Sequence, residues 1–553
     1  MLDTGPVLYL ATATFVLVSL SWGRKRWENR SRPPLPPGPP CLPLLGSILS
    51  LDDPSRPWLS FNAFRSTYGD IIYARLLTKP VVVVNSEEIA RDLFELRSTI
   101  YSDKPQSIVH EAFAMDFSIA FFPYGDRWRL HRRIFHQQFR QAAIPTYHHE
   151  LLRSAHKMLF SFLQNPHNYT SHVQMFTSSF ILSIVYDYQP KSENDRLVRI
   201  ILKYTELAVA AVGPRAAMVM ETFPFLLQLP VWFPGATFKR TSVECHKAGQ
   251  DAKEIPFKYV TDRMASHIAR SIEHNGLTQN HNQMNGFENK VIEKAIKEAA
   301  RTAFAATNET TVGTILVFLL AMVLHPEVQA KVQADIDRVI GKDRLPDFND
   351  RPALPYVEAV LRETLRWHPV APMGLYILSQ FQLNPTVLSG IPHATTTSDI
   401  YNGYFIPKGV DVIPNTAMTH DEQKYPNPDE FKPERFLHED GSLTSDTMPL
   451  GFGLGRRSCV GRYLVEAALW VAITSFLATF SIQKTLDEHG EEIPVVPKFT
   501  TGLIIHPETF PCRIVPRFKD ASVESLTQLT GLGSSESIDI NFEPNTDIVG
   551  EQS

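Results

Sequence analysis

The hydrophobic and polar positions along the chain predict a mainly helical protein with a little β-sheet. Over long stretches the apolar residues recur at helical spacing, which is typical of helices that pack one face against a core. The clearest of these stretches are 127–141, 289–324, 327–340, 356–367 and 461–478. Between 68 and 85 the pattern is strand-like, and shorter strand-like pieces follow at 411–413 and 502–505. We therefore expect a mainly α fold with a small β-sheet domain near the N-terminus.

The first apolar run differs from the others because it carries no charge at all. It covers residues 6–22, and Arg24, Lys25 and Arg26 follow directly. The run is just long enough to span a bilayer, and its basic flank belongs on the cytosolic side. A cleaved signal peptide is the alternative, but its positive charges would precede the run. We expect a transmembrane anchor at 6–22, then a basic and Pro-rich linker at 23–40 whose prolines make it semi-rigid.

Charge is distributed unevenly along the chain. The 553 residues carry 54 Lys and Arg against 59 Asp and Glu, which gives a net charge of −5. Seven of the acids and none of the bases lie after Lys519, in a segment rich in Ser, Gly and Thr. This composition predicts a disordered, acidic tail at 520–553. The rest of the chain is nearly neutral, so it lacks the basic footprint of a nucleic-acid-binding protein.

The four cysteines are few and far apart. They are Cys41, Cys245, Cys459 and Cys512, with no C-x-x-C spacing among them. So few cysteines in so long a chain argue against a disulfide framework or a zinc site. We expect a reducing compartment, and a cysteine that matters for function is expected to act alone.

The segment 452–461 reads FGLGRRSCVG and carries the most informative chemistry of the chain. Its glycines, with the one at 451, permit tight backbone turns close to a flat ligand. A helix is predicted to start just after Cys459, and its free N–H groups and positive dipole end would favour a thiolate. Arg457, two residues earlier, can neutralise a propionate. A haem iron held by Cys receives electron density that favours O–O cleavage. The alternative is a small buried cysteine beside a Gly-rich turn.

This segment resembles the haem-binding signature of the cytochrome P-450 family, F-x-x-G-x-R-x-C-x-G, and matches it at every fixed position. The resemblance implies haem b as the cofactor, with Cys459 as the axial ligand of the iron and Phe452, Arg457 and Gly461 in the haem-binding loop. It covers roughly 33–517 and implies a single cytochrome P-450 domain at 41–519. The expected fold is helix-rich, with the haem between a long helix and the cysteine loop.

Two further motifs stand in the family's order. Glu363 and Arg366 are three apart on a predicted helix, so they share a face, and Pro433-Glu434-Arg435-Phe436 follows downstream. By resemblance, Glu363, Arg366 and Arg435 form a structural triad that shapes the cysteine side of the haem. Trp128 and Arg132 are one helical turn apart. The resemblance implies that Arg132 reaches a haem propionate and that Trp128 packs there. Without the cysteine motif, each of these would be read as a surface residue.

The long apolar helix carries Ala306-Thr307-Asn308-Glu309-Thr310-Thr311, which resembles the family's oxygen-activating motif. The Thr310 hydroxyl can bond back to the carbonyl of Ala306 and open the helix where dioxygen must fit. Glu309 and Thr310 are the expected catalytic residues because a proton relay needs an acid and a movable hydroxyl. Thr307 departs from the motif, which has Gly there, and its branched side chain is expected to crowd the oxygen groove. The alternative is a threonine-bearing core helix.

An anomalous stretch interrupts the family pattern near the haem. Residues 372–374 would join 391–393 smoothly, and by resemblance His393 binds a haem propionate. The intervening residues 375–390 are uncharged and largely apolar, whereas a tolerated loop insertion is normally polar and exposed. Our hypothesis is a retained intron, and a genuine lineage-specific loop is the alternative. If the stretch is present in the protein, it is expected to hold His393 away from the propionate.

The resemblance implies an oxygenase. Electrons would come from NADPH through a cytochrome P-450 reductase, with cytochrome b5 as a second candidate donor, and the basic helix carrying Arg127, Arg129 and Arg133 is a candidate docking face. One oxygen atom of O2 would enter an apolar substrate as a hydroxyl or epoxide. The Phe- and Met-rich segment 113–122 suggests that apolar substrate, although core packing explains it as well. The general pattern resembles fungal enzymes of secondary metabolism and xenobiotic oxidation.

Two other functions remain open from the sequence. A reductase-independent isomerase or dehydratase would keep the thiolate haem, but such enzymes often lack the acid and alcohol pair. A catalytically impaired, haem-poor membrane protein would result if 375–390 or Thr307 disturbs the site. For the active enzyme the expected location is the endoplasmic reticulum membrane, with a single span and a cytosolic catalytic domain.

Overall fold

The computed structural model describes most of the catalytic region of the chain. The described residues are 32–42, 45–52, 57–76, 79–192, 194–211, 220, 223–264, 286–371, 392–500 and 504–532. The predicted anchor at 6–22, the first half of the linker (23–31) and the whole anomalous stretch at 375–390 lie outside these ranges. The catalytic residues expected from the sequence all lie inside them.

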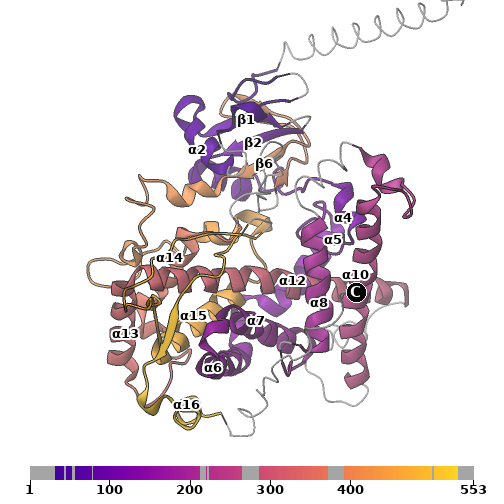
Figure 1. The fold of residues 1–553 in the computed structure, drawn as a ribbon. Helices are drawn as coiled ribbons and strands as arrows, with labels where there is room; N and C mark the ends of the chain where they lie inside the picture. Colours follow the sequence, from indigo (N-terminus) through magenta and orange to yellow (C-terminus); the bar gives the residue numbers. More distant parts are fainter. Residues whose placement is uncertain are drawn as a thin grey trace, which may run out of the picture.

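Helices form the larger part of the molecule (Figure 1). The α-helices of the described residues are α2 (Pro57–Tyr68), α3 (Glu87–Arg91), α4 (Ile108–Ala112), α5 (Asp126–Phe139), α6 (His148–Gln164), α7 (Tyr169–Tyr186), α8 (Arg196–Ala211), α10 (Thr237–Met264), α12 (Gly286–Leu324), α13 (Pro326–Ile340), α14 (Pro355–Trp367), α15 (Arg462–Thr479) and α16 (Val523–Thr530). Pro326 and Pro355 occupy the first position of α13 and α14, where the missing N–H of proline costs nothing.

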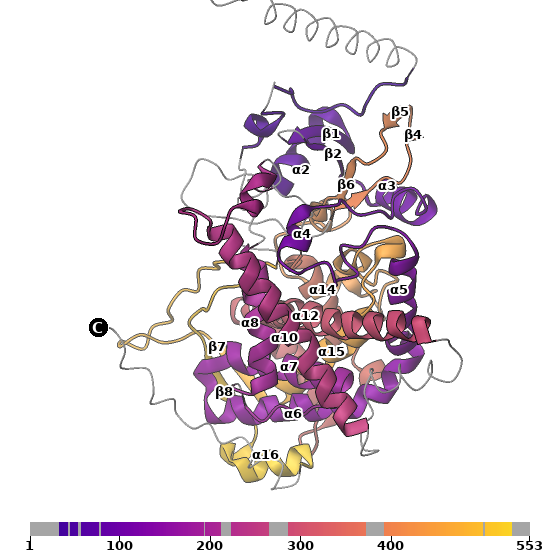
Figure 2. The ribbon, with the colours of Figure 1, turned by 90° about the vertical axis from the view of Figure 1, so that its right-hand side faces the viewer.

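The strands form one four-stranded sheet and two hairpin-like pairs. The sheet has the order β1 (Ile71–Leu76), β2 (Lys79–Val84), β6 (Asp411–Pro414) and β3 (His393–Ala394). β1 and β2 pair antiparallel, with Ile71 opposite Val84, and β2 pairs parallel with β6. Two small pairs, β4 (Asp399–Tyr401) with β5 (Tyr404–Ile406) and β7 (Phe480–Gln483) with β8 (Arg513–Pro516), complete the set. Figures 1 and 2 show the four-stranded sheet at one end of the molecule, beyond the helices.

The core of the helical part is built around α12 and α15. α12 packs against α5, α7, α10, α14 and α15. Within the described residues, only these two helices are long and apolar enough to cross a membrane, and 83% and 78% of their apolar windows are buried in the protein. Their apolar composition therefore reflects burial in the core, which needs no membrane to explain it.

The predicted elements compare well with the structure. The five predicted helices are confirmed, each end to within three residues, and so are the strands within 68–85 and at 411–413. The predicted strand at 502–505 is wrong for its described residues, 504 and 505, which are not in a strand. The long helices α6, α7, α8 and α10 were not singled out from the sequence.

The predicted disordered tail starts too early. Residues 523–530 form α16, which begins after Ser522, whose side chain accepts a hydrogen bond from the Ser525 amide. α16 packs against α6, and Leu526 is fully buried. Two apolar residues three apart, Leu526 and Leu529, pack this short helix on the core because α6 supplies the partner face.

Candidate functional site

The Cys459 loop is a tight turn that approaches the rest of the protein closely. Gly455 has φ = 63°, and a Cβ atom there would lie 1.8 Å from the carbonyl oxygen of Phe94, so only glycine fits. The amide of Cys459 donates to the carbonyl of Phe452 at 2.8 Å. α15 begins three residues later, with Gly461 at its N-cap. The predicted sequence of glycine turn, cysteine and helix start is therefore present.

The Cys459 side chain combines two properties that rarely occur together. It has exposed surface, yet the protein around it is dense enough that burial raises the pKa of its thiol. A hydrogen bond from the Gly461 amide and the charge of Arg132 act in the opposite direction, but burial outweighs them. The start of α15 therefore favours the thiolate, as expected, but by less than burial disfavours it.

α12 turns an accessible face toward the interior of the protein. Ala306 is exposed and Glu309 and Thr310 are partly exposed, although this helix runs through the core. The predicted bond is present, since Thr310 Oγ1 donates to the Ala306 carbonyl at 2.8 Å. Burial raises the pKa of Glu309. Thr307 is only 8% exposed and so lies off the accessible face, which argues against the expected crowding of that face.

Two partly buried arginines near the cysteine loop have neutral partners. Arg132 donates to the carbonyl of Ser458 at 2.6 Å. Arg457 donates to three backbone carbonyls, of Ser102, Ile119 and Phe122, and its guanidinium lies 4.8 Å from the ring centroid of Trp128. Burial lowers the pKa of Arg132, and it lowers the pKa of Arg457 to about 10. The Trp128 ring, 6% exposed, thus packs against Arg457.

His393 lies near Arg457 and Lys104. It lies on β3, and its Nδ1 donates to the carbonyl of Tyr101 at 2.7 Å. Burial, together with the charges of Lys104 and Arg457, lowers its pKa well below the usual value. The stretch 375–390 therefore does not carry His393 away from Arg457. Sequence reasoning missed Lys104, whose signal was its place in the segment 101–105, which precedes the Phe- and Met-rich segment 113–122 (the covering loop).

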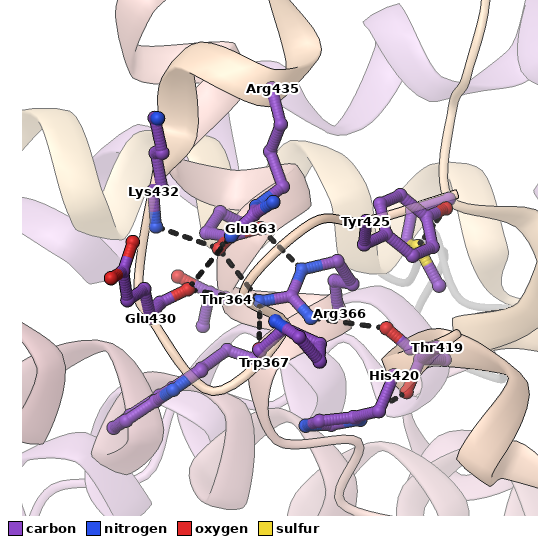
Figure 3. A network of polar contacts seen from close by, with 12 residues as sticks. Glu363, Thr364, Arg366, Trp367, Thr419, His420, Tyr425, Glu430, Lys432 and Arg435 are labelled. Atoms are coloured by element: carbon purple, nitrogen blue, oxygen red, sulfur yellow. Dashed lines mark hydrogen bonds and ion pairs between the residues drawn. The ribbon is translucent and has the colours of Figure 1, made fainter. Parts of the chain in front are cut away.

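The predicted triad is assembled at the start of the segment that leads to the cysteine loop (Figure 3). Glu363 and Arg366, both fully buried on α14, form a bidentate pair at 2.6 and 2.8 Å. Arg435, from the 3-10 helix Pro433–Phe436, donates to Glu363 at 3.2 Å. The Lys432 amide donates to the same carboxylate at 2.7 Å. The two arginines also bind carbonyls of residues 419, 426–428 and 430, so the triad fixes the chain before the cysteine loop.

These residues fit a haem. The donor set offers one accessible sulfur, an accessible face of α12, and partly buried cations whose hydrogen-bond partners are neutral. Such cations call for anionic groups, and the two propionates of haem b supply them. Within the described residues there is no group of three or more His, Cys, Asp or Glu side chains that could hold a metal ion.

Comparison with known proteins agrees with this chemistry. The sequence profile of the family described as cytochrome P-450 matches residues 36–378 and 381–510. A cytochrome P-450 monooxygenase of Armillaria gallica is 34% identical over 94% of this chain and 99% of its own length. The cytochrome P-450 monooxygenase claR of Ampulloclitocybe clavipes is 35% identical, over 90% of this chain and 89% of its own length.

The fold and the thiolate site therefore define a haem-thiolate class of protein. The chain belongs to the cytochrome P-450 family and is a monooxygenase of that family. A third relative, eriA of Hericium erinaceus, is 35% identical over 88% of this chain and 89% of its own length. Membership implies haem b as the cofactor and oxygenation as the general chemistry.

Proposed function

We propose that this protein inserts one oxygen atom of O2 into an apolar organic substrate, with Cys459 as the axial ligand of haem b. The observation that carries the proposal is the accessible Cys459 thiol in a dense surrounding, together with the accessible face of α12. Bound haem supplies an iron centre that takes electrons and activates dioxygen. Hydroxylation or epoxidation is the expected outcome.

The protein's own residues hold the haem and its ligand in place. Arg132, Arg457 and His393 would bind the propionates, with Trp128 packed beside Arg457. Phe452 and Gly461 fix the cysteine loop through backbone bonds to Cys459. The triad of Glu363, Arg366 and Arg435 positions the chain that leads to this loop and touches no substrate.

Glu309 and Thr310 would deliver protons to the reaction space. Burial raises the pKa of Glu309, so more of its carboxyl group stays protonated near neutral pH and can donate. Thr310 Oγ1 donates a hydrogen bond to the Ala306 carbonyl in this structure. Rotation of the hydroxyl would let it accept a hydrogen bond from an acid and donate one toward the substrate. The pair favours an oxygenase over a reductase-independent isomerase or dehydratase of the same fold.

Electrons would arrive from NADPH through a cytochrome P-450 reductase, with cytochrome b5 as a second donor. The exposed side chains of Arg129, Arg133 and Arg140 on and after α5 give this helix a basic outer face. An acidic flavoprotein surface is complementary to such a region.

The surface supports attachment to a membrane. Large apolar side chains are exposed in the segment 223–233, where Trp232 is 79% and Phe225 57% exposed, and in the segment 42–59, where Leu49 is 63% exposed. Exposed aromatic residues of this kind prefer the interface between headgroups and water. We propose that these segments rest on the endoplasmic reticulum membrane, to which residues 6–22 anchor the chain by a single span. Loss of liposome flotation in a Phe225→Ser, Trp232→Ser variant that starts at residue 31 would support this.

A second candidate is a catalytically impaired protein, and the stretch 375–390 is the specific reason to keep it. The match to the family profile is divided into two parts, which end at residue 378 and begin again at residue 381, within this stretch. Sequencing the mature transcript tests the origin of the stretch: a spliced message that still encodes it rules out the intron.

The reduced carbon monoxide difference spectrum is the deciding experiment. It is recorded for the full chain and for a variant lacking 375–390. A strongly red-shifted Soret band in the full chain supports Cys459 ligation and an active protein. A band only in the deletion variant supports the impaired protein, and absence from both contradicts the thiolate site. Labelled ¹⁸O2 in products formed with NADPH and reductase then separates an oxygenase from an isomerase or dehydratase.

A further inference from the structure

Arg301 is a buried cation that the proposed haem chemistry does not use. It lies on α12, between Glu298 and Ala305, and is only 4% exposed. Its guanidinium lies between two aromatic rings, 3.7 Å from the centroid of Phe117 and 3.9 Å from that of Tyr204. Burial lowers its pKa. A guanidinium in such a place costs free energy unless its donors are satisfied.

The donors of Arg301 are largely unsatisfied. Nη2 makes one long bond, 3.4 Å, to the carbonyl of Ala114. Nε is enclosed and has no partner. The guanidinium also makes a hydrogen bond with the Tyr204 side chain, and within the described residues it has no other hydrogen-bond partner. The two aromatic faces offset part of the cost of burying the charge. They leave N–H donors from which a planar anion could accept two parallel hydrogen bonds, the geometry that guanidinium favours.

The nearby acids are not available to Arg301. In the part of the chain that the structure describes, no carboxylate bonds to it. Glu298, one turn earlier on α12, is bound by His131 at 3.1 Å and Arg127 at 3.0 Å. Asp116 is exposed on the covering loop and influences Arg301 only through its charge. By contrast, Lys297, the cation one turn before Arg301, is paired with Glu254 and Glu293.

Arg301 lies on the same side of α12 as residues of the proposed site of oxidation. Ala305 and Glu309 follow at intervals of one turn on the same side of the helix, and both are partly exposed within the core, as is Thr310. The residues around Arg301 come from the covering loop, α8 and α10: Phe117, Tyr204 and Gly249, where a Cβ atom would lie 2.8 Å from Nη2. Arg301 is five residues before Ala306, which corresponds to about 7.5 Å along the axis.

From these observations we propose that the substrate is an apolar molecule that carries a carboxylate, and that Arg301 binds this carboxylate. The carboxylate would accept from the free donors of the guanidinium, while the apolar body lies along the Ala305 and Ala306 face of α12. Arg301 then sets which carbon is oxidised, because it fixes the distance between the anionic end and the reaction centre. This inference rests on the proposed haem-thiolate function and narrows its substrate class.

The test uses imidazolyl alkanoic acids of graded chain length and their methyl esters, with the full chain loaded with haem. The imidazole end ligates the iron and shifts the Soret band, so the affinity of each probe is measured without knowledge of the substrate. We expect the acid to bind roughly 10- to 100-fold more tightly than its ester at one intermediate chain length, as for one charge-assisted hydrogen bond. Shorter and longer probes should show little difference.

Three variants assign the effect. Arg301→Met should bring the ratio of acid to ester affinity to about one, and Arg301→Lys should retain part of it. Lys297→Gln, which removes a paired cation one turn away, should leave the ratio unchanged. A ratio near one at all lengths in the wild-type protein would overturn the inference and leave Arg301 as a clamp on the covering loop. If Arg301→Met does not retain haem, two measurements still test the inference: the dependence of the acid-to-ester ratio on chain length in the wild-type protein, and the same ratio in Arg301→Lys. Failure of plain imidazole to shift the band would instead contradict the haem-thiolate function.

Discussion

The two buried charged regions of this protein treat their arginines in opposite ways. On the cysteine side, Arg366 is fully buried and bound by the carboxylate of Glu363 and by backbone carbonyls. Around the reaction space, Arg132, Arg457 and Arg301 are also buried or nearly so, but their hydrogen-bond partners are neutral. A charge that is paired inside the protein holds the fold together, whereas a charge left with neutral partners is prepared for an anion that arrives from outside.

The largest expected effect comes from Cys459→Ser, which tests whether the second region is a haem site at all. We expect complete loss of the red-shifted Soret band of the reduced carbon monoxide complex because no thiolate remains. Cys512→Ser removes a thiol far from this loop in sequence and should leave the band intact. Retention of the band in Cys459→Ser would show that another residue ligates the iron.

The next largest effect tests the paired region. Arg366→Met leaves Glu363 buried with only Arg435 beside it, and we expect the free energy of unfolding to fall by about 3–5 kcal/mol. Arg338→Met breaks a pair of the same spacing with Asp335, but Arg338 is 69% exposed, so a loss of at most about 1 kcal/mol is expected. Urea unfolding of both variants measures the difference. Equal losses would show that burial does not distinguish the two pairs.

Glu309→Gln tests the proton supply on the α12 face. We expect turnover to fall by about a hundredfold. Burial raises the pKa of Glu309, so the acid form is present at low pH and is lost as pH rises through that raised pKa. The wild-type rate should therefore decline on the alkaline side, and the Gln variant should lack this limb of the pH profile. The same limb in the variant would assign the proton donor to another group.

Arg457→Met sharpens the comparison because it removes an unpaired cation. The apoprotein should lose little stability, but haem should be lost more readily, by roughly 10- to 100-fold in the dissociation rate, for one charge-assisted hydrogen bond. Transfer of haem to apomyoglobin measures this rate. A large loss of apoprotein stability with unchanged haem retention would place Arg457 with the structural arginines.

The smallest effect on stability is expected for two threonines of α12. Thr310 and Thr314 bond to the carbonyl four residues earlier at 2.8 and 2.9 Å, respectively. Replacement of either by Val should change the free energy of unfolding by about 1 kcal/mol or less. Only Thr310→Val should raise the hydrogen peroxide formed per NADPH consumed, since only Thr310 belongs to the proposed proton relay. Equal peroxide yields would remove Thr310 from the relay.

Much of the fold and of the site could be predicted because the relevant signals are local. The helix at 289–324 follows from its spacing of apolar residues. The turn at Cys459 follows from the glycines beside it, of which Gly455 has no room for a side chain. Glu363 and Arg366 share a helix face through their spacing alone. Helix α16 was missed because its stability depends on the partner face of α6, which the sequence of the tail does not contain.

The sequence by itself determined which residue types are present in this protein and in what order: one cysteine in a glycine-rich loop, an acid and an alcohol on a long apolar helix, and a Glu and two Arg. Only the tertiary structure decided which charges meet. It joins Arg435 to Glu363 from 72 residues away and places Lys104 near His393. It also leaves Arg301 between two rings from distant segments without an acid. The reason is physical, because pairing and burial depend on contacts between segments that no local pattern encodes.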